Sequence, residues 1–214
     1  MEDIMKEKRM IISIGRECGS GGHEIGEKLA RHYGINFYDK NLINELAERK
    51  NMDPEKLSAL EEKVSGYILP VHKGGFEDKS LMDKMTESDK LFLMEKALIK
   101  ELAEKESFVI VGRAANAILE NDENTLHLYV YAPESFKIPR VKEFYHLDTD
   151  REARKKMLKV DKGRSQYFNF YTNRQWGSPD DHDFMINSAV FGIDGTVRLI
   201  IDLADGKFNS QKVS

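Results

Sequence analysis

Three things are scarce in this sequence, and each shortage excludes a class of protein. Cys18 is the only cysteine among 214 residues, so the chain has no internal disulfide and no cysteine-based zinc site. No apolar run approaches the roughly 18 residues of a membrane-spanning helix, and the first residues lack the apolar segment of a signal peptide. The net charge of −4 argues against general nucleic-acid binding, which depends on basic surface. We therefore expect a cytoplasmic protein that does not bind membranes.

What the sequence does contain is the pattern of one α/β domain, which we place at residues 1–214. Short, nearly continuous apolar runs are typical of parallel strands that are covered on both faces. Such runs predict strands at Met10–Ile14, Ile35–Tyr38, Phe108–Val111, Leu126–Tyr131 and Phe184–Ile186. Helical patterns alternate with them, so we predict right-handed crossovers and a doubly wound parallel sheet, with ligands at the carboxyl ends of its strands.

The helical segments are predicted from apolar residues spaced three or four apart. Their expected inward-facing positions are Ile25, Leu29 and Tyr33; Leu42, Ile43, Leu46 and Ala47; and Leu91, Met94, Leu98 and Leu102. Ser88 or Asp89 is expected to cap the third of these helices. Thr149 and Glu152 have the spacing of a capping box that opens a fourth.

Two polar segments interrupt this alternation. Residues 51–87 have no sustained apolar period, and residues 148–173 form a charged helical run that ends in aromatic residues. Because both lie between sheet elements, we interpret them as mobile lids over a site, with solvated surface helices as the alternative. The aromatic residues at 167–171 fit core packing better than a platform for stacking bases. Residues 209–214 are expected to be disordered.

Residues 11–24, IISIGRECGSGGHE, have the layout of a phosphate-binding loop. An apolar run ends at Gly15, further glycines follow, and a helical pattern begins after them. Glycines let backbone N–H groups approach an anion, and a helix N-terminus adds about half a positive charge. The common motif GxxxxGK[ST] has a lysine where this sequence has Gly22, followed here by His23, and the glycine spacing here is one residue longer. The sequence therefore predicts phosphate binding without the usual lysine.

Cations around a transferred phosphoryl group would have to come from elsewhere, since phosphoryl transfer needs positioning and positive charge. Arg16 lies in the loop itself and Arg113 directly follows an expected strand, so these two are the leading candidates. Candidates on the late helices are Arg140, Arg154, Lys162 and Arg164. Each is weighed against the simpler interpretation of a solvated surface charge, because the chain has 33 lysines and arginines.

Other polar residues near the loop have competing interpretations. Asp39 can hold a magnesium-bound water or a substrate hydroxyl, or it can cap the helix that follows. Glu17 can meet magnesium or pair with Arg16. Cys18 lies near a helix N-terminus, which would lower its pKa, but no partner base is evident and we expect no catalytic thiol. His23 is interpreted as a polar residue at a helix start.

The chain closely resembles the cytidylate kinase-like family of P-loop proteins from Met10 to about Ile200. The segments that carry the resemblance are IISIGRECGSGGHEIGEKLARHYGINFYDKNLI, VIVGRAANAIL, LHLYVYAP, KVDKGRSQYFNFYT and INSAVFGIDGT. The family is similar to the nucleoside-monophosphate kinases, which transfer the γ-phosphoryl group of ATP in a magnesium-dependent reaction. The resemblance implies a P-loop NTPase-like α/β fold, a five-stranded parallel sheet with an acceptor-binding insertion at 51–87 and a helical lid at 148–173. It also implies ATP and Mg²⁺ as cofactors and a nucleotide and a small-molecule acceptor as partners, and it leaves a homo-oligomer open.

The resemblance further implies roles for particular residues. The phosphate-binding candidates are Gly15, Gly19, Ser20, Gly21, Gly22 and His23. Asp39 and Arg113 would face the acceptor, and no residue is assigned as a metal ligand. The catalytic candidates are Arg16, Arg113, Lys162 and Arg164, the last two as lid cations. The sequence departs from cytidylate kinases at Gly22, where they keep a lysine, and at Ala114, where they have an aspartate; loss of one such contact can cost about 2.7–4 kcal/mol.

We therefore predict an ATP-dependent phosphotransferase in which an arginine such as Arg16 replaces the lysine. The alternative is a nucleotide-binding regulatory protein that keeps the fold and has little or no catalysis. A dinucleotide-dependent oxidoreductase fits less well, because the glycines do not have GxGxxG spacing. The direction of Arg16 discriminates between the first two: a side chain that points into solvent would favour the regulatory alternative.

Overall fold

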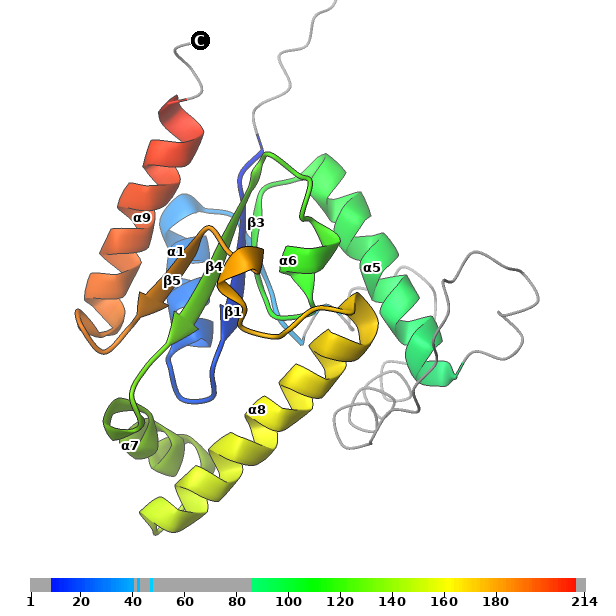
Figure 1. Ribbon diagram of the computed structural model, residues 1–214. Coiled ribbons are helices and arrows are strands. Elements are labelled where there is room, and N and C mark those ends of the chain that lie inside the picture. The colour runs from blue at the N-terminus through cyan, green and yellow to red at the C-terminus, as the bar shows by residue number, and fades with distance from the viewer. Residues whose placement is uncertain (1–8, 41, 43–46, 48–85, 211–214) are drawn as a thin grey trace, which may run out of the picture.

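The computed structural model describes residues 9–40, 42, 47 and 86–210, which form a parallel β-sheet between two layers of helices (Figure 1). The elements follow in the order β1 (Ile11–Arg16), α1 (Gly22–Tyr33), β2 (Asn36–Tyr38), α5 (Glu87–Lys105), β3 (Phe108–Val111), α6 (Ala115–Ile118), β4 (Thr125–Tyr131), α7 (Glu134–Tyr145), α8 (Asp150–Thr172), the 3₁₀ turn η1 (Pro179–Asp181), β5 (Phe184–Asn187) and α9 (Gly192–Ser210). The 5-stranded sheet has the order β2-β3-β1-β4-β5, and every neighbouring pair in it is parallel. This topology confirms the predicted doubly wound α/β sheet.

Strand β1 lies in the middle of the sheet because its side chains are apolar on both faces. Ile11 packs toward α5 and α6, whereas Ile12 and Ile14 pack toward α1 and α9, and all three are fully buried. The strand continues two residues beyond its predicted end at Ile14, because Gly15 and Arg16 pair with β4. Arg16 therefore belongs to the carboxyl end of the central strand, which corrects its expected place in the loop.

Capping residues mark the starts of α5 and α8, and the sequence predicted them correctly only for α8. α8 begins with the predicted capping box, in which Thr149 and Glu152 exchange hydrogen bonds. The predicted caps of α5 are wrong: Thr86 is the cap, and Asp89 is the third helical residue that returns a bond to it. The threonine side chain accepts a hydrogen bond from the backbone N–H three residues ahead, and the carboxylate of that residue accepts one from the threonine N–H. This reciprocal pair fixes where α5 begins.

The expected inward-facing residues are largely buried. Those below one tenth exposure are Ile25, Leu29, Leu42, Ala47, Leu91, Leu98 and Leu102, while Tyr33 and Met94 are partly buried. Ile43 and Leu46 lie outside the described residues, as do 51–85 of the expected acceptor-binding insertion and the end of the chain from residue 211. Residues 209 and 210 continue α9, so the disorder expected for them is corrected. No helix in the described ranges is long and apolar enough to cross a bilayer.

Helix α8 is attached to the domain near both of its ends. Toward its start, Ala153 and Met157 are buried against Ile138 and Val141 of α7. Toward its end, α8 approaches α5 (Figure 1), and Phe168 is buried in the same cluster as the apolar residues of α5. The helix therefore crosses the carboxyl edge of the sheet as a packed element, and its middle turns lie beside the ends of the central strands.

Candidate functional site

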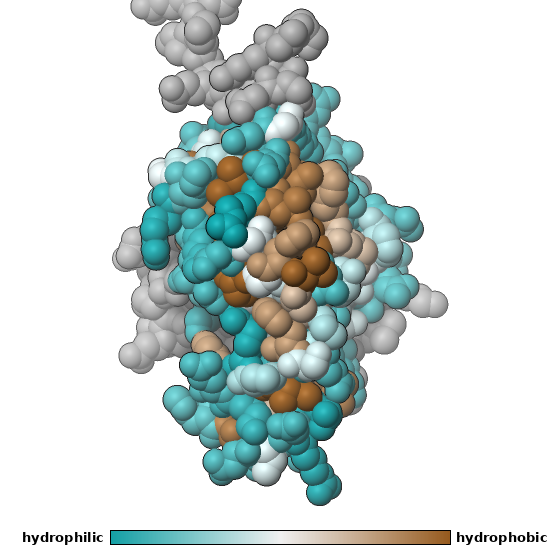
Figure 2. Space-filling view, turned by 90° about the vertical axis from the view of Figure 1, so that its left-hand side faces the viewer, coloured by the Kyte–Doolittle hydropathy of each residue, from teal (hydrophilic) through white to brown (hydrophobic). Residues whose placement is uncertain are grey.

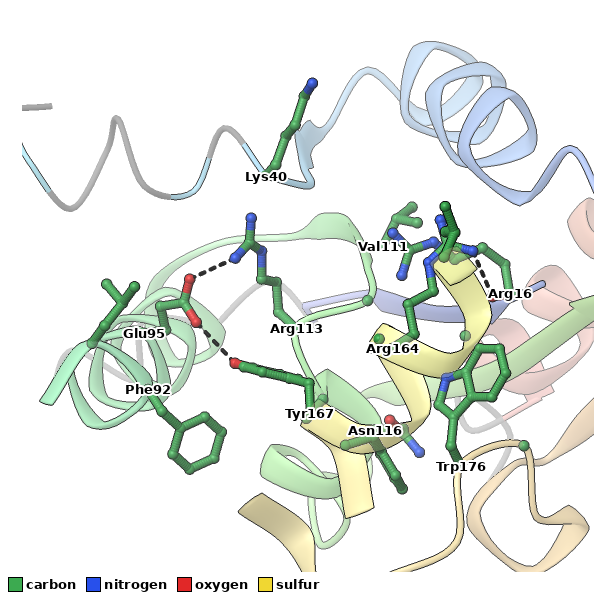
Figure 3. A pocket seen from close by; sticks show the side chains of 18 of the residues that line it. Arg16, Lys40, Phe92, Glu95, Val111, Arg113, Asn116, Arg164, Tyr167 and Trp176 are labelled. Carbon is green, nitrogen blue, oxygen red and sulfur yellow. Dashed lines mark hydrogen bonds and ion pairs between the residues drawn. The ribbon is translucent and has the colours of Figure 1, made fainter. Parts of the chain in front are cut away.

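A cleft of about 380 Å³ opens at the carboxyl ends of β1 and β3, between α5 and α8. Its lining combines cationic side chains with aromatic rings, among them Arg16, Glu95, Arg113, Arg164, Tyr167 and Trp176. Figure 3 shows the three arginines in the upper part of the cleft in this view, with the ring of Tyr167 and the amide of Asn116 below them. The cleft therefore has a strongly cationic end and a more neutral, aromatic end.

Arg16 supplies the central cation of this cleft. Its guanidinium group lies against the backbone of Gly112, at a place where any side chain on residue 112 would collide with it, and Gly112 has a φ of +82° that favours glycine. Burial, and after it the charges of Arg164 and Arg113, lower the pKa of Arg16 to about 9. It therefore stays protonated at neutral pH, and within the described part of the chain it forms no ion pair. Arg16 points into the cleft and not into solvent.

Arg113 is aimed into the cleft by a buried carboxylate. Its Nη1 is 2.8 Å from Oε1 of Glu95 on α5, and the side chains of Arg113 and Glu95 are 10% and 2% exposed. The hydroxyl of Tyr167 donates to the other oxygen of Glu95 at 3.0 Å (Figure 3). Arg113 adopts the left-handed conformation with a φ of 58°, and its Nε donates to the carbonyl of Asp39 at 3.3 Å. A strained backbone and a buried network thus fix the direction of this guanidinium.

Glu95 and Tyr167 are site residues that the sequence analysis missed. A signal was present for Glu95: it occupies the inward-facing position between Leu91 and Leu98, where a charged residue is unexpected. Burial and the nearby negative charge of Glu95 raise the pKa of Tyr167 well above its usual value, so its hydroxyl remains a donor. The aromatic group at the end of α8 packs as expected, with Tyr171 stacked on Phe92 at a centroid distance of 4.2 Å.

The glycine loop between β1 and α1 has features that suit an anion, and it is also tightly packed against neighbouring side chains. Gly19 and Gly21 both have a φ of +83°, and no side chain caps the N-terminus of α1. The four N–H groups of a first helical turn have no partners within the helix, so this end is electropositive. A side chain on Gly21 would collide with Ile193, and one on Gly19 would lie 2.7 Å from Cγ2 of Val141.

The structure divides the predicted phosphate-binding residues into two groups. Gly15 lines the cleft together with Arg16, whereas residues 19–23 are not among the described residues that line it. Ser20 is fully buried, and its hydroxyl donates to the carbonyl of Glu17 at 2.9 Å. His23 lies in the first turn of α1, and its Nε2 is 2.8 Å from a carboxylate oxygen of Asp39.

The two acidic candidates have partners of their own. Asp39 is only 4% exposed, and its hydrogen bond is the largest of the causes that raise the pKa of His23. The carbonyl of Asp39 accepts from the N–H of Leu42 at 3.2 Å. Glu17 pairs with Lys137 at 2.7 Å, which corrects the suggested pairing of Glu17 with Arg16. Arg16 extends into the cleft, while Glu17 turns to the opposite side of the strand end.

Of the late cations, Arg164 alone reaches the described lining of the cleft. Its Nη1 donates to the carbonyl of Arg16 at 3.3 Å and to Asp161 at 3.1 Å. Lys162 is on the exposed side of α8. Arg140 and Arg154 form ion pairs with Glu24 at 2.8 Å and Glu134 at 3.0 Å, as surface arginines commonly do.

Cys18 is not an activated thiol. It is 4% exposed and packs between α7 and α8. Burial raises its pKa, which corrects the lowering expected from the nearby helix N-terminus, because the charged thiolate is disfavoured inside the protein.

Comparison with known proteins shows the family of this chain. The model of the cytidylate kinase-like family matches residues 11–190. The chain is 27% identical over 154 residues to a cytidylate kinase from Methanopyrus kandleri. The aligned segment covers 72% of this chain and 71% of that protein. An uncharacterized protein from Eubacterium ventriosum has a similar structure, with a TM-score of 0.70, 31% identity and coverage of 92% of this chain and 99% of that one. A shikimate kinase from Bacteroides thetaiotaomicron shares the fold at 16% identity, with a TM-score of 0.51 and coverage of 92% and 98%.

A parallel sheet with a glycine loop and an arginine-lined cleft at its carboxyl edge defines an α/β protein of the P-loop kinase class. The family match extends from β1 to the segment after β5, so it includes the loop, the cleft and both helices beside it. The chain belongs to the cytidylate kinase-like family, and its function is kinase-like.

Proposed function

We propose that this protein transfers a phosphoryl group from ATP to a small acceptor that occupies the cleft between α5 and α8. The observation that carries the proposal is Arg16, a partly buried cation at the end of the central strand with no ion pair in the described part of the chain. A guanidinium in such a place is costly unless an anion joins it. Phosphate oxygens would supply that anion in the geometry that arginine binds best.

The residues present fit the phosphates of a nucleotide better than they fit a protein-held metal ion. The uncapped N-terminus of α1 and the cations of Arg16 and Arg164 suit phosphate oxygens. The carboxylates of Glu17 and Asp39 are already bonded to Lys137 and His23. Mg²⁺ commonly retains its waters and is held through substrate phosphates. When bound with ATP, it would neutralise phosphate charge during transfer.

Each cation then has a distinct task. Arg16 would bind phosphate oxygens from the floor of the cleft, in place of the missing lysine. Arg164 would bind them from α8, and Arg113, held by Glu95, would orient the acceptor. Phosphoryl transfer requires little more from the protein than positioning and charge stabilisation. Arg16 lines the cleft and does not point into solvent, which favours this proposal over the regulatory alternative.

The test is turnover with magnesium ATP against a panel of nucleoside monophosphates and small alcohols, measured as ADP release. Arg16→Met keeps the first two side-chain carbons that pack on Gly22 but removes the charge. We expect that variant to lose about 10²–10³ in kcat, the loss typical of one preorganised charge contact. The control is Arg198→Ala, which removes an exposed arginine from α9. If the protein binds ATP but releases no ADP with any acceptor in the panel, the regulatory alternative is favoured.

The remaining parts of the proposal follow from composition. We propose a cytoplasmic protein, since its single cysteine is buried and unpaired. Its proposed partners are the nucleotide and the small-molecule acceptor, without general binding to nucleic acids or membranes; size-exclusion chromatography would test for a homo-oligomer.

A further inference from the structure

The carboxylate of Asp161 on α8 contacts the glycine loop, to which the proposed function assigns phosphate binding. Its Oδ1 accepts a hydrogen bond from the backbone N–H of Cys18 at 2.8 Å. The same oxygen accepts from Nη1 of Arg164 at 3.1 Å. One carboxylate oxygen therefore holds a loop amide and a cleft cation together, and a nucleotide phosphate oxygen would use donors of the same two kinds.

We propose that Asp161 is an internal competitor of the nucleotide: it holds the Cys18 amide and Arg164 until a phosphate oxygen replaces it at both. The inference rests on the proposed function and concerns the regulation of the same site. It makes nucleotide binding an exchange of one anion for another. Neither the amide nor the guanidinium is left without an acceptor after the exchange, so the cost of unpaired polar groups is avoided.

The surroundings of Asp161 favour its release once a stronger anion is present. Burial raises the pKa of Asp161, which means that its charged form is disfavoured where it lies. The charge of Glu17 also raises this pKa, while Arg164, the hydrogen bond from Cys18 and Lys137 lower it. Rotation of the side chain toward water would relieve the desolvation, and the incoming phosphate would take over the two donors.

The exchange requires a movement of the side chain and not of the whole helix. α8 is held by Ala153 and Met157 on one side of Asp161 and by Phe168 on the other, in separate apolar clusters. Moving the helix away would expose both clusters, whereas rotating one aspartate exposes neither. Arg164 would keep its bond to the carbonyl of Arg16 and stay beside the phosphates.

The first experiment compares ATP binding to the wild-type protein and to Asp161→Asn by isothermal titration calorimetry. Asparagine has the size of aspartate, and its amide oxygen can still accept a hydrogen bond from the Cys18 N–H. It carries no charge, so it should compete with phosphate less strongly. We expect the Kd for ATP, and for inorganic tripolyphosphate, to fall about tenfold, because a charge-assisted bond is replaced by a weaker neutral one. Glu143→Gln is the matched control, since it removes an exposed carboxylate from the neighbouring helix α7 and should leave Kd unchanged.

A second measurement does not depend on affinity. Hydrogen exchange of the Cys18 amide, followed by NMR without nucleotide, should be about tenfold faster in Asp161→Ala than in the wild type, because no acceptor remains. Adding ATP should slow it again. If ATP binds the wild type but Asp161→Asn binds it equally or more weakly, the competition is refuted while nucleotide binding stands. If neither protein binds ATP or tripolyphosphate, the proposed function is refuted and the competition with it.

Discussion

Arg16 and Gly22 exclude each other's side chains: a Cβ on residue 22 would lie 2.6 Å from the Cβ of Arg16 and 3.1 Å from its Cγ. Residue 22 is where the common phosphate-loop motif has its lysine. A lysine there and an arginine at the end of β1 cannot both be accommodated without movement of the backbone. There is therefore room for one of these two side chains at this place, and in this sequence it is the arginine on the strand.

Restoring the lysine by itself should harm this protein. We expect Gly22→Lys to lower the free energy of unfolding by about 1–3 kcal/mol, the usual range for overpacking. Adding Arg16→Gly removes the colliding carbons, so the double variant should be more stable than the two single effects predict. Urea unfolding of all four proteins gives the coupling energy, for which we expect at least about 0.5 kcal/mol. Simple additivity would show that the two side chains do not compete.

Removing Arg113 should cost stability as well as turnover, because it takes away the cation that faces the buried carboxylate of Glu95. The side chain of Glu95 is 2% exposed, and breaking a buried pair from one side typically costs about 3–5 kcal/mol. In urea unfolding, Arg113→Ala should lower the free energy of unfolding by that amount. The double variant Arg113→Ala with Glu95→Gln should recover part of this free energy without recovering turnover. The exposed pair of Lys105 and Glu101 is the control, since Lys105→Ala should cost no more than about 0.5 kcal/mol. Equal losses at the two sites would refute the argument.

The pair of His23 and Asp39 should make stability depend on pH in one direction. The hydrogen bond to Asp39 raises the pKa of His23 in the folded protein above its usual value near 6.5. The stabilisation is therefore complete below that usual value and is lost as the pH rises through the folded pKa. We expect the difference in Tm between wild type and His23→Gln to be largest near pH 5.5 and to disappear by about pH 8.5. A constant difference across that range would contradict the pairing.

Substitution of Gly21 should lower the stability of the fold, so such a variant is a poor test of phosphate binding. The residue has a φ of +83°, and a new side chain would collide with Ile193 of α9. We expect Gly21→Ala to lower the free energy of unfolding by about 1–3 kcal/mol. Pairing it with Ile193→Ala should remove the collision but leave the backbone strain, so only part of the loss should return. Recovery of the full stability would show that the strain at Gly21 is negligible.

The sequence was sufficient for the sheet because its strands are short apolar runs that differ sharply from the helices between them. Phe108–Val111 is observed as predicted, and the other strand boundaries differ by two residues at most. The end of β1 could not be predicted, because a glycine and an arginine do not look like strand residues. They join the strand through backbone pairing with β4, which depends on the neighbouring strand and not on their side chains.

The candidate site was predicted less completely than the fold, for reasons that involve contacts distant in the sequence. Arg16, Arg113 and Arg164 were proposed from their places at strand ends and on the lid, and the structure brings them into one cleft. Asp161 escaped notice because its role requires the amide of Cys18, which is 143 residues away. Such a contact follows only from the way α8 crosses the sheet.

The chain contains a single tryptophan, and its ring lines the cleft, edge to face with Tyr129 at a centroid distance of 5.6 Å. Its fluorescence therefore reports on this one place, without a label and without background from another indole. Acceptors that enter the cleft can be found by the change in emission even when they are never phosphorylated. The protein thus carries its own probe for small molecules that bind in this cleft.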